Sequence, residues 1–208
     1  MFALTVDQVD SRHGEDLVTE ILADRDGWQA RGAVRGPDRT AGDEFQLLIP
    51  DAAAALDAAL RLTREGRWSV GIGVGEVETP LPPTTGEARG TALIAARAAV
   101  EAAKHAPRRF AVAAADEAGA SGVSALIGLL LETRARRTPE GWEVADLMAE
   151  GLTQVRIAAR LAVTPQAISL RARAAAVRLE LEALPALAAA LGALEAGPDA
   201  ERPIRSPA

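Results

Sequence analysis

Two spacings of apolar residues divide the first two thirds of the chain into strands and helices. Phe2, Leu4 and Val6 alternate with small or polar residues, a period of two that is typical of a half-buried strand. Spacings of three and four residues between Leu17 and Leu22 predict a helix. By the same patterns, the predicted strands are residues 2–7, 28–34, 45–49, 68–74 and 109–113. The predicted helices are residues 11–25, 51–63, 90–104 and 124–134.

The order of these elements indicates the fold class. Strand, helix, strand, strand, helix, strand is the order of a ferredoxin-like palm, here followed by a further helix and strand. We therefore expect an α+β protein, with a palm sheet covered by helices in residues 1–118. Residues 79–86, rich in proline and threonine, are expected to form a mobile loop.

A pair of short helices is predicted beyond residue 150. Thr153 can cap the first helix, and Thr164 followed by Pro165 can start the second, because proline is tolerated at the first helical position. The shared core is expected to contain Ile157, Ala158, Leu161, Val163 and Ile168. This pattern is typical of a helix-turn-helix, with alanine at position 162 where the turn usually has glycine.

The charge distribution points to DNA as the partner of these helices. Residues 152–178 contain five arginines and no acidic residue, whereas the whole chain has a formal net charge of −6. Such asymmetry concentrates the attraction for a polyanion in one region. The expected DNA-contacting residues are Arg156, Arg160, Thr164, Gln166, Ser169, Arg171 and Arg173. The alternative is two packed helices with a solvated arginine face.

A heptad repeat follows the second of these helices and predicts a homodimer. Its apolar positions are Leu170, Val177, Leu184 and Leu191, with Ala174, Leu181 and Ala188 between them. They would form a coiled-coil seam, broken or kinked at Pro185. Alternatively, the same stripe packs on the chain's own helix near residues 125–131. We expect a connecting helix and linker at 119–141, a helix-turn-helix domain with a dimerisation helix at 142–196, and a disordered tail at 197–208.

Composition excludes several functional classes. The chain has no cysteine and only two histidines, so disulfides, thiolate zinc sites and Cys-His catalysis are ruled out, and no Ser-His-Asp set is indicated. No apolar run is long enough to span a membrane, and no signal segment is recognised at the start. We therefore expect a cytoplasmic protein without a membrane partner.

Two acidic residues are candidate metal ligands. Asp7 ends the first strand and Asp43 lies in a later hairpin, and in a palm fold these two strands are neighbours. Paired carboxylates at such a place can hold Mg²⁺, which prefers oxygen ligands and bridges to nucleotide phosphates. The alternative is a tight hairpin in which Gly42 supplies a positive φ and the acidic side chains are only solvated.

Four short motifs resemble those of a known family. They are Asp7-Gln8-Val9-Asp10-Ser11-Arg12, Gly42-Asp43-Glu44-Phe45-Gln46, Gly71-Ile72-Gly73-Val74-Gly75 and Ala95-Ala96-Arg97. In this order they resemble the motifs of class III nucleotide cyclases and GGDEF domains. The resemblance is closest to SatD-like bacterial proteins, which join such a domain to a C-terminal helix-turn-helix.

The resemblance implies roles for particular residues. Asp7 and Asp43 match metal-binding aspartates, Arg39 stands where cyclases place a base-contacting lysine, and Arg97 matches the arginine that steadies transition-state charge. The implied ligand is a purine nucleotide or a cyclic dinucleotide, with Mg²⁺. Leu93 stands where cyclases have an asparagine, so a nucleotide-shaped cleft is implied more strongly than a reaction.

Ser11 and Arg12 are further candidates for phosphate binding, because they follow the first strand at the start of a predicted helix. Helix capping is the alternative role for this pair. The glycines of residues 71–75 do not have the spacing of a dinucleotide fingerprint, and they are expected to allow close backbone approach or a bulge.

Together these features predict a DNA-binding transcriptional regulator. Its cyclase-like domain would sense a nucleotide or act as a dimerisation or interaction platform. The alternative is a Mg²⁺-dependent nucleotide cyclase or nucleotide hydrolase tethered to DNA. A third hypothesis is a scaffold that recruits another protein without any small ligand.

Overall fold

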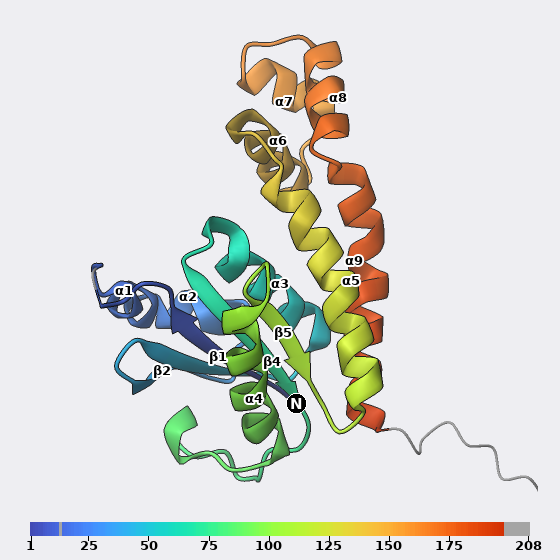
Figure 1. Cartoon of the computed structure of the whole chain (residues 1–208). Helices are drawn as coiled ribbons and strands as arrows, with labels where there is room; N and C mark the ends of the chain where they lie inside the picture. The colour runs from blue at the N-terminus through green and yellow to red at the C-terminus, as the bar shows by residue number, and fades with distance from the viewer. Residues whose placement is uncertain (13, 198–208) are drawn as a thin grey trace, which may run out of the picture. The chain divides into compact units, whose positions relative to one another are not determined.

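The computed structural model describes residues 1–12 and 14–197, and these fall into two compact units (Figure 1). The sheet unit contains residues 1–127 together with the described residues from 187 onward, and the helical unit contains residues 128–186. The predicted disordered tail, apart from Gly197, lies outside the described residues. Within the described residues, no helix combines the length and apolar character needed to cross a bilayer.

The sheet unit is built on a mixed sheet. Its strands are β1 (Phe2–Gln8), β2 (Arg35–Ala41), β3 (Glu44–Ile49), β4 (Trp68–Val74) and β5 (Phe110–Ala113). Their order in the sheet is β2-β3-β1-β4-β5. Strand β1 is antiparallel to both β3 and β4, and β5 is parallel to β4. The predicted α+β class is confirmed at this level.

The helices of the sheet unit differ in part from those predicted. They are α1 (Leu17–Ala23), α2 (Arg25–Ala30), α3 (Ala52–Leu62) and α4 (Thr91–His105), with the first part of α5 (Glu117–Ala135) and the last part of α9 (Val177–Ala193). The prediction of a strand at residues 28–34 is wrong, because Trp28 lies buried on α2 with its amide donating to the Asp24 carbonyl at 3.1 Å.

The proline-rich residues 79–86 are tied to strand β2. The guanidinium of Arg35 donates to the carbonyl oxygens of Pro82 and Leu81, at 2.5 and 3.1 Å. The amide of Thr85 donates to the Asp38 carboxylate at 2.8 Å, where a short 3₁₀ turn, Thr85–Glu87, begins. The expectation of a loop without any element is therefore wrong at its C-terminal end.

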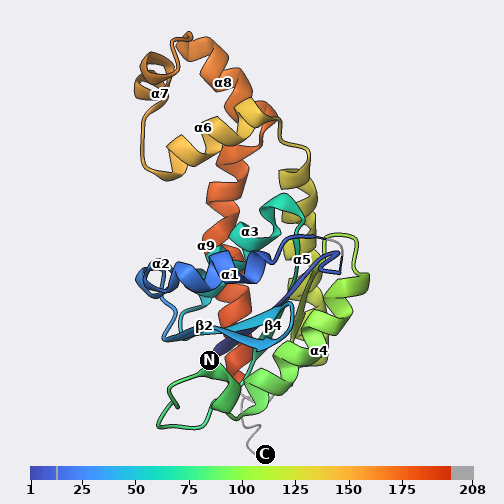
Figure 2. The same ribbon diagram turned by 90° about the vertical axis from the view of Figure 1, so that its left-hand side faces the viewer.

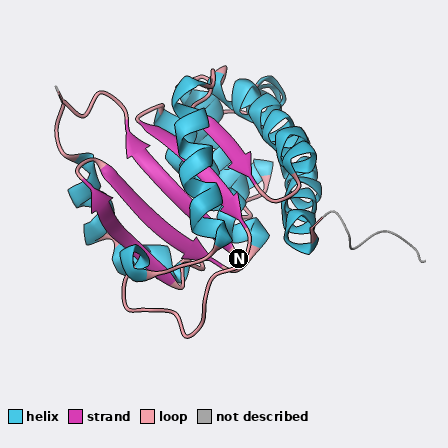
Figure 3. Ribbon diagram, turned by 60° about the horizontal axis from the view of Figure 1, so that its bottom comes forward, coloured by secondary structure: helices cyan, strands magenta, loops and turns pink. Residues whose placement is uncertain are grey.

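Helix α4 lies across one face of the sheet (Figure 3), and two strand glycines allow its close approach. A Cβ on Gly71 would lie 2.2 Å from the Val100 amide nitrogen, and one on Gly73 would lie 2.0 Å from that of Ala96. The predicted close backbone approach is confirmed. The opposite face carries bulky buried side chains, including Phe2, Leu4 and Val6 of β1.

The helical unit contains three helices that share one core (Figure 2). They are α6 (Pro139–Ala149), α7 (Gln154–Arg160) and α8 (Pro165–Ala174). The two short helices predicted from the caps form where they were expected. Ile157 and Ile168 are fully buried between them, and Leu161 and Val163 pack at the edge of the same core.

Helix α9 runs through Pro185 without interruption, so the predicted break there is wrong. The heptad positions on it are not all exposed. Val177 belongs to the core of the helical unit, and Leu191 is fully buried in the sheet unit. At these two positions the stripe is buried within the chain and is not free to form a coiled-coil seam. Packing of the stripe on residues 125–131 stays a prediction.

The turn between α7 and α8 contains a strained alanine. Ala162 has φ of 54°, in the left-handed region where a Cβ costs roughly 1–2 kcal/mol. Replacement of Ala162 by glycine removes that strain. It also costs about 0.5–1 kcal/mol of stability, because glycine loses more conformational entropy on folding. We expect Ala162→Gly to raise the free energy of unfolding by about 0.5–1 kcal/mol, measured by urea denaturation.

The matched control is Ala159→Gly, at an exposed position inside α7. Glycine in a helix interior costs about 1 kcal/mol, so this variant is expected to be less stable than the wild type. Equal destabilisation by both substitutions would contradict a left-handed residue at position 162.

Candidate functional site

Helix α8 presents a polar stripe built by its helical periodicity. Gln166, Ser169 and Arg173 are three and four residues apart and therefore share one side of the helix. Gln166 and Arg173 are exposed, and Ser169 is partly exposed. We call these three residues the α8 stripe. Its glutamine and serine side chains can both donate and accept hydrogen bonds, and its arginine side chain can only donate.

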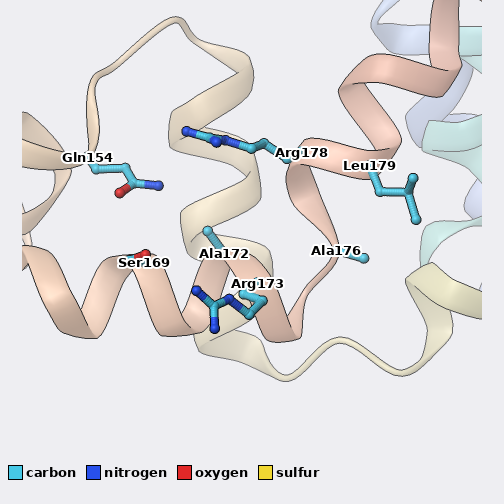
Figure 4. A pocket seen from close by; sticks show the side chains of 7 residues that line it. All are labelled: Gln154, Ser169, Ala172, Arg173, Ala176, Arg178 and Leu179. Carbon is cyan, nitrogen blue, oxygen red and sulfur yellow. The ribbon is translucent and has the colours of Figure 1, made fainter.

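Beside the stripe lies a hollow of about 360 Å³. It is lined by Gln154, Ser169, Ala172, Arg173, Ala176, Arg178 and Leu179. In Figure 4 the side chains of Gln154, from the start of α7, and Arg178, from α9, extend toward one another. Two guanidinium groups and an amide thus line this hollow, and such groups donate hydrogen bonds to anions.

Capping contacts and a small apolar core position both helices. The hydroxyl of Thr153 accepts from the Arg156 amide at 3.4 Å, and that of Thr164 accepts from the Ala167 amide at 3.2 Å. These contacts satisfy amides that would otherwise be unpaired at a helix start. Thr164, predicted to contact DNA, therefore has a structural role at the N-terminus of α8.

The other predicted arginines lie away from the α8 stripe. Arg171 is half a turn round α8 from Ser169, on the side where its charge helps to keep the pKa of Glu140 low. That pKa is lowered first by the glutamate's own backbone amide and then by the Thr138 hydroxyl. Arg160, on α7, lies 3.8 Å from the Glu150 carboxylate, and Arg156 is exposed on the same helix.

The sheet unit brings the predicted metal ligands to one edge of the sheet. Asp7 is opposite Glu44 in the β1–β3 register, and the Gln8 amide donates to the Asp43 carbonyl at 3.0 Å. Asp43 also accepts a hydrogen bond from the Ser11 hydroxyl. The backbones of Asp7 and Asp43 thus lie close together, as expected for neighbouring strands, and Ser11 contacts Asp43.

Two cations from α4 already neutralise this edge. The ammonium of Lys104 lies 3.0 Å from the Asp7 carboxylate, and Arg97 pairs with the buried carboxylate of Glu44. Burial lowers the pKa of Lys104, but hydrogen bonds to Glu101 and Asp7 outweigh it, and the net shift is upward. Lys104 therefore stays charged beside Asp7.

The donor set at this edge fits a divalent ion poorly. Asp7 is paired with Lys104, and Asp43 with Ser11, so a metal ion would have to displace a bound ammonium to reach both carboxylates. Within residues 1–12 and 14–197, no three His, Cys, Asp or Glu side chains are grouped closely enough to hold a metal ion. No chemical step through Mg²⁺ follows from this arrangement.

The remaining predicted nucleotide contacts are spread out. Arg39 donates to the Asp16 carboxylate at 2.7 Å and to the Thr19 hydroxyl at 3.0 Å, both near the start of α1. Arg12 is exposed in the turn after β1. A separate hollow of about 990 Å³ adjoins Gly75, Thr91 and Ala113, and none of the predicted nucleotide or metal residues lines it.

Sequence reasoning missed Glu44, Lys104, Gln154 and Arg178. Glu44 stood inside a quoted motif, but its partner Arg97 is 53 positions away. Lys104 lies seven residues after Arg97 on α4 and so shares its face, a local signal that could have found it. Arg178 was counted among the five arginines without being assigned to a site.

The contact of Arg39 with Asp16 predicts a pH dependence. The Arg39 and Thr19 side chains hold the pKa of Asp16 below its usual value of 3.8. A lowered carboxyl pKa adds stability above the unfolded pKa that is lost as the pH falls through the folded one. We expect Asp16→Asn, which keeps a capping oxygen for α1, to lower the urea midpoint at pH 7 but not at pH 2. An equal difference at both pH values would contradict the ion pair.

Comparison of the chain with protein-family models, with curated proteins and with solved structures found no match.

Proposed function

We propose that this chain is a DNA-binding transcriptional regulator whose helical unit contacts duplex DNA. The observation that carries this proposal is the α8 stripe of Gln166, Ser169 and Arg173, exposed beside a hollow that Arg178 also lines. Glutamine and arginine make bidentate hydrogen bonds to adenine and guanine edges, and serine suits either base or phosphate.

The geometry of α7 and α8 supports a helix-turn-helix. Two short helices joined by a left-handed turn residue bury a common core, with the second helix exposing its polar side. In such a motif the second helix enters the major groove and the first crosses the backbone. Arg156 would then contact phosphate, and Gln154 with Arg178 would hold another phosphate at the hollow.

The strand order of the sheet unit supports the second half of the proposal. In β2-β3-β1-β4 each neighbouring pair is antiparallel, which supports a ferredoxin-like palm with β5 added at the edge. We propose that this palm is a cyclase-like regulatory domain that senses a nucleotide or serves as a dimerisation or interaction platform. The Lys104–Asp7 and Arg97–Glu44 pairs favour this over a Mg²⁺-dependent cyclase or hydrolase.

Salt dependence of binding tests the DNA-binding half. The full chain is titrated into a fluorescent duplex of random sequence at several salt concentrations, because each phosphate contact contributes about 0.9 to the slope of log K against log salt. We expect a measurable slope that falls by about one in Arg156→Ala. Absence of binding at low salt would refute the proposal.

Calorimetry tests the regulatory half. The purified chain is titrated with purine nucleotides and cyclic dinucleotides, with and without Mg²⁺, and Asp43→Ala serves as the control. One ligand that binds the wild type and not the variant would support nucleotide sensing. If no ligand gives heat, nucleotide sensing is refuted.

A further inference from the structure

Leu170 is a large apolar residue exposed within the polar stripe of α8. Its side chain is 64% exposed, and it stands four residues after Gln166 and three before Arg173, on their side of the helix. The heptad repeat assigned it to a dimer seam. The next heptad position, Val177, is buried in the core of the helical unit and cannot extend such a seam.

The major groove offers one apolar group to a helix that enters it. This group is the C5-methyl of thymine, whereas the other groups that distinguish the base pairs there donate or accept hydrogen bonds. A leucine placed between a glutamine and an arginine on the same helical side would reach the groove together with them. Its exposed apolar surface would be removed from water by contact with such a methyl group.

We propose, on the basis of the DNA-binding function above, that Leu170 contacts the methyl group of a thymine and makes the protein specific for that base. Gln166 and Arg173 would read hydrogen-bonding groups of the neighbouring base pairs. Leu170 would then read the position between them by apolar contact, as a specificity-determining residue.

Removal of the methyl group from DNA tests this directly. Binding sites are first selected with the full chain from a pool of random duplexes. Each thymine of the selected site is then replaced singly by deoxyuridine, which keeps every hydrogen-bonding group and lacks only the methyl. We expect one position at which this change weakens wild-type binding about fourfold, the size expected for one buried methyl group.

The variants complete a double-mutant cycle. Leu170→Ala is expected to bind the thymine duplex about fourfold more weakly than the wild type does. Its affinity should not change further when deoxyuridine replaces that one thymine. Leu170→Met, which keeps an apolar contact, is expected to retain the discrimination. Leu129→Ala is the matched control, because Leu129 is 68% exposed on α5 and lies outside the stripe.

Four results would overturn the inference. A selected site that is insensitive to deoxyuridine everywhere would overturn it while leaving DNA binding intact, as would equal deoxyuridine sensitivity in the wild type and Leu170→Ala. If Leu170→Ala dissociates a dimer that Leu129→Ala retains, a second copy of the chain covers Leu170 instead. If no sequence is selected, the DNA-binding proposal fails and this inference fails with it.

Discussion

Replacement of Glu180 by alanine is expected to lower the stability of the helical unit by about 3–5 kcal/mol, the usual cost of leaving a buried charge without its partner. Glu180 is paired with Arg134 at 2.7 Å and also with Arg137, whose side chain is only 1% exposed. Without the carboxylate, the buried guanidinium group of Arg137 would lose its ion pair with Glu180.

The rest of this cluster explains why the loss would spread through the unit. Arg137 also donates to the Ala175 carbonyl at 2.8 Å, at the end of α8. Both guanidinium groups stack on the ring of Trp142 in α6, at 4.9 and 4.8 Å from its centre. One carboxylate thus organises the contacts that join α5, α6, α8 and α9 within the helical unit.

Hydrogen exchange of amides in α6 to α8 measures this effect within the helical unit. A loss of 3 kcal/mol would reduce their protection by about two powers of ten, at about 1.4 kcal/mol for each tenfold change. Glu182→Ala is the matched control, because Glu182 is exposed two residues further along α9 and should change stability by less than about 0.5 kcal/mol. Unchanged protection in Glu180→Ala would contradict the buried pairing.

Replacement of Arg173 or Gln166 by alanine is expected to weaken binding to a selected duplex by about 1–3 kcal/mol each. Both side chains belong to the α8 stripe, where they can form bidentate contacts with base edges. We also expect each variant to lose its preference for one base pair of the site. Binding is measured by fluorescence anisotropy on the selected duplex and on single-base variants of it.

Two other arginines provide controls for this prediction. Arg171→Ala removes the same charge from the opposite side of α8 and should leave the base preference unchanged. Arg156→Ala should weaken binding to the selected duplex and to a random duplex by the same factor, because a phosphate contact carries no sequence information. If Arg173→Ala also weakens binding to both duplexes equally, Arg173 contacts phosphate and not a base.

Local signals were sufficient to predict α7 and α8. Thr153 and Thr164 cap the helices through hydrogen bonds to amides only three residues further along the chain. Pro165 occupies the first position of α8. Such short-range interactions are encoded in adjacent residues, so sequence alone locates them. The burial of Ile157 and Ile168 followed from the same helical spacing.

Strand β2 could not be predicted in the same way. Its sequence, Arg35–Ala41, contains Gly36 and Pro37 and has no apolar alternation. Proline is tolerated there because β2 is an edge strand, and its pairing with β3 shifts register between Arg35 and Asp38. The partner strand, and not the local sequence, determines that these residues are extended.

Charge pairs between distant positions were also beyond sequence reasoning. Asp7 and Asp43 could be placed together because the motifs of a palm fold imply it. Nothing near Asp7 in the sequence indicates that its partner is Lys104, since their pairing requires α4 to cross the sheet. The same holds for Glu180, whose partner Arg137 is 43 positions away.

Selection of DNA sites by the full-length chain tests the central claim most directly. A pool of random duplexes is enriched over several rounds with the wild type and, in parallel, with the double variant Gln166→Ala, Arg173→Ala. We predict that the wild type enriches one sequence motif and that the double variant enriches none. Enrichment of the same motif by both proteins, or of no motif by the wild type, would contradict recognition of DNA through the exposed side of α8.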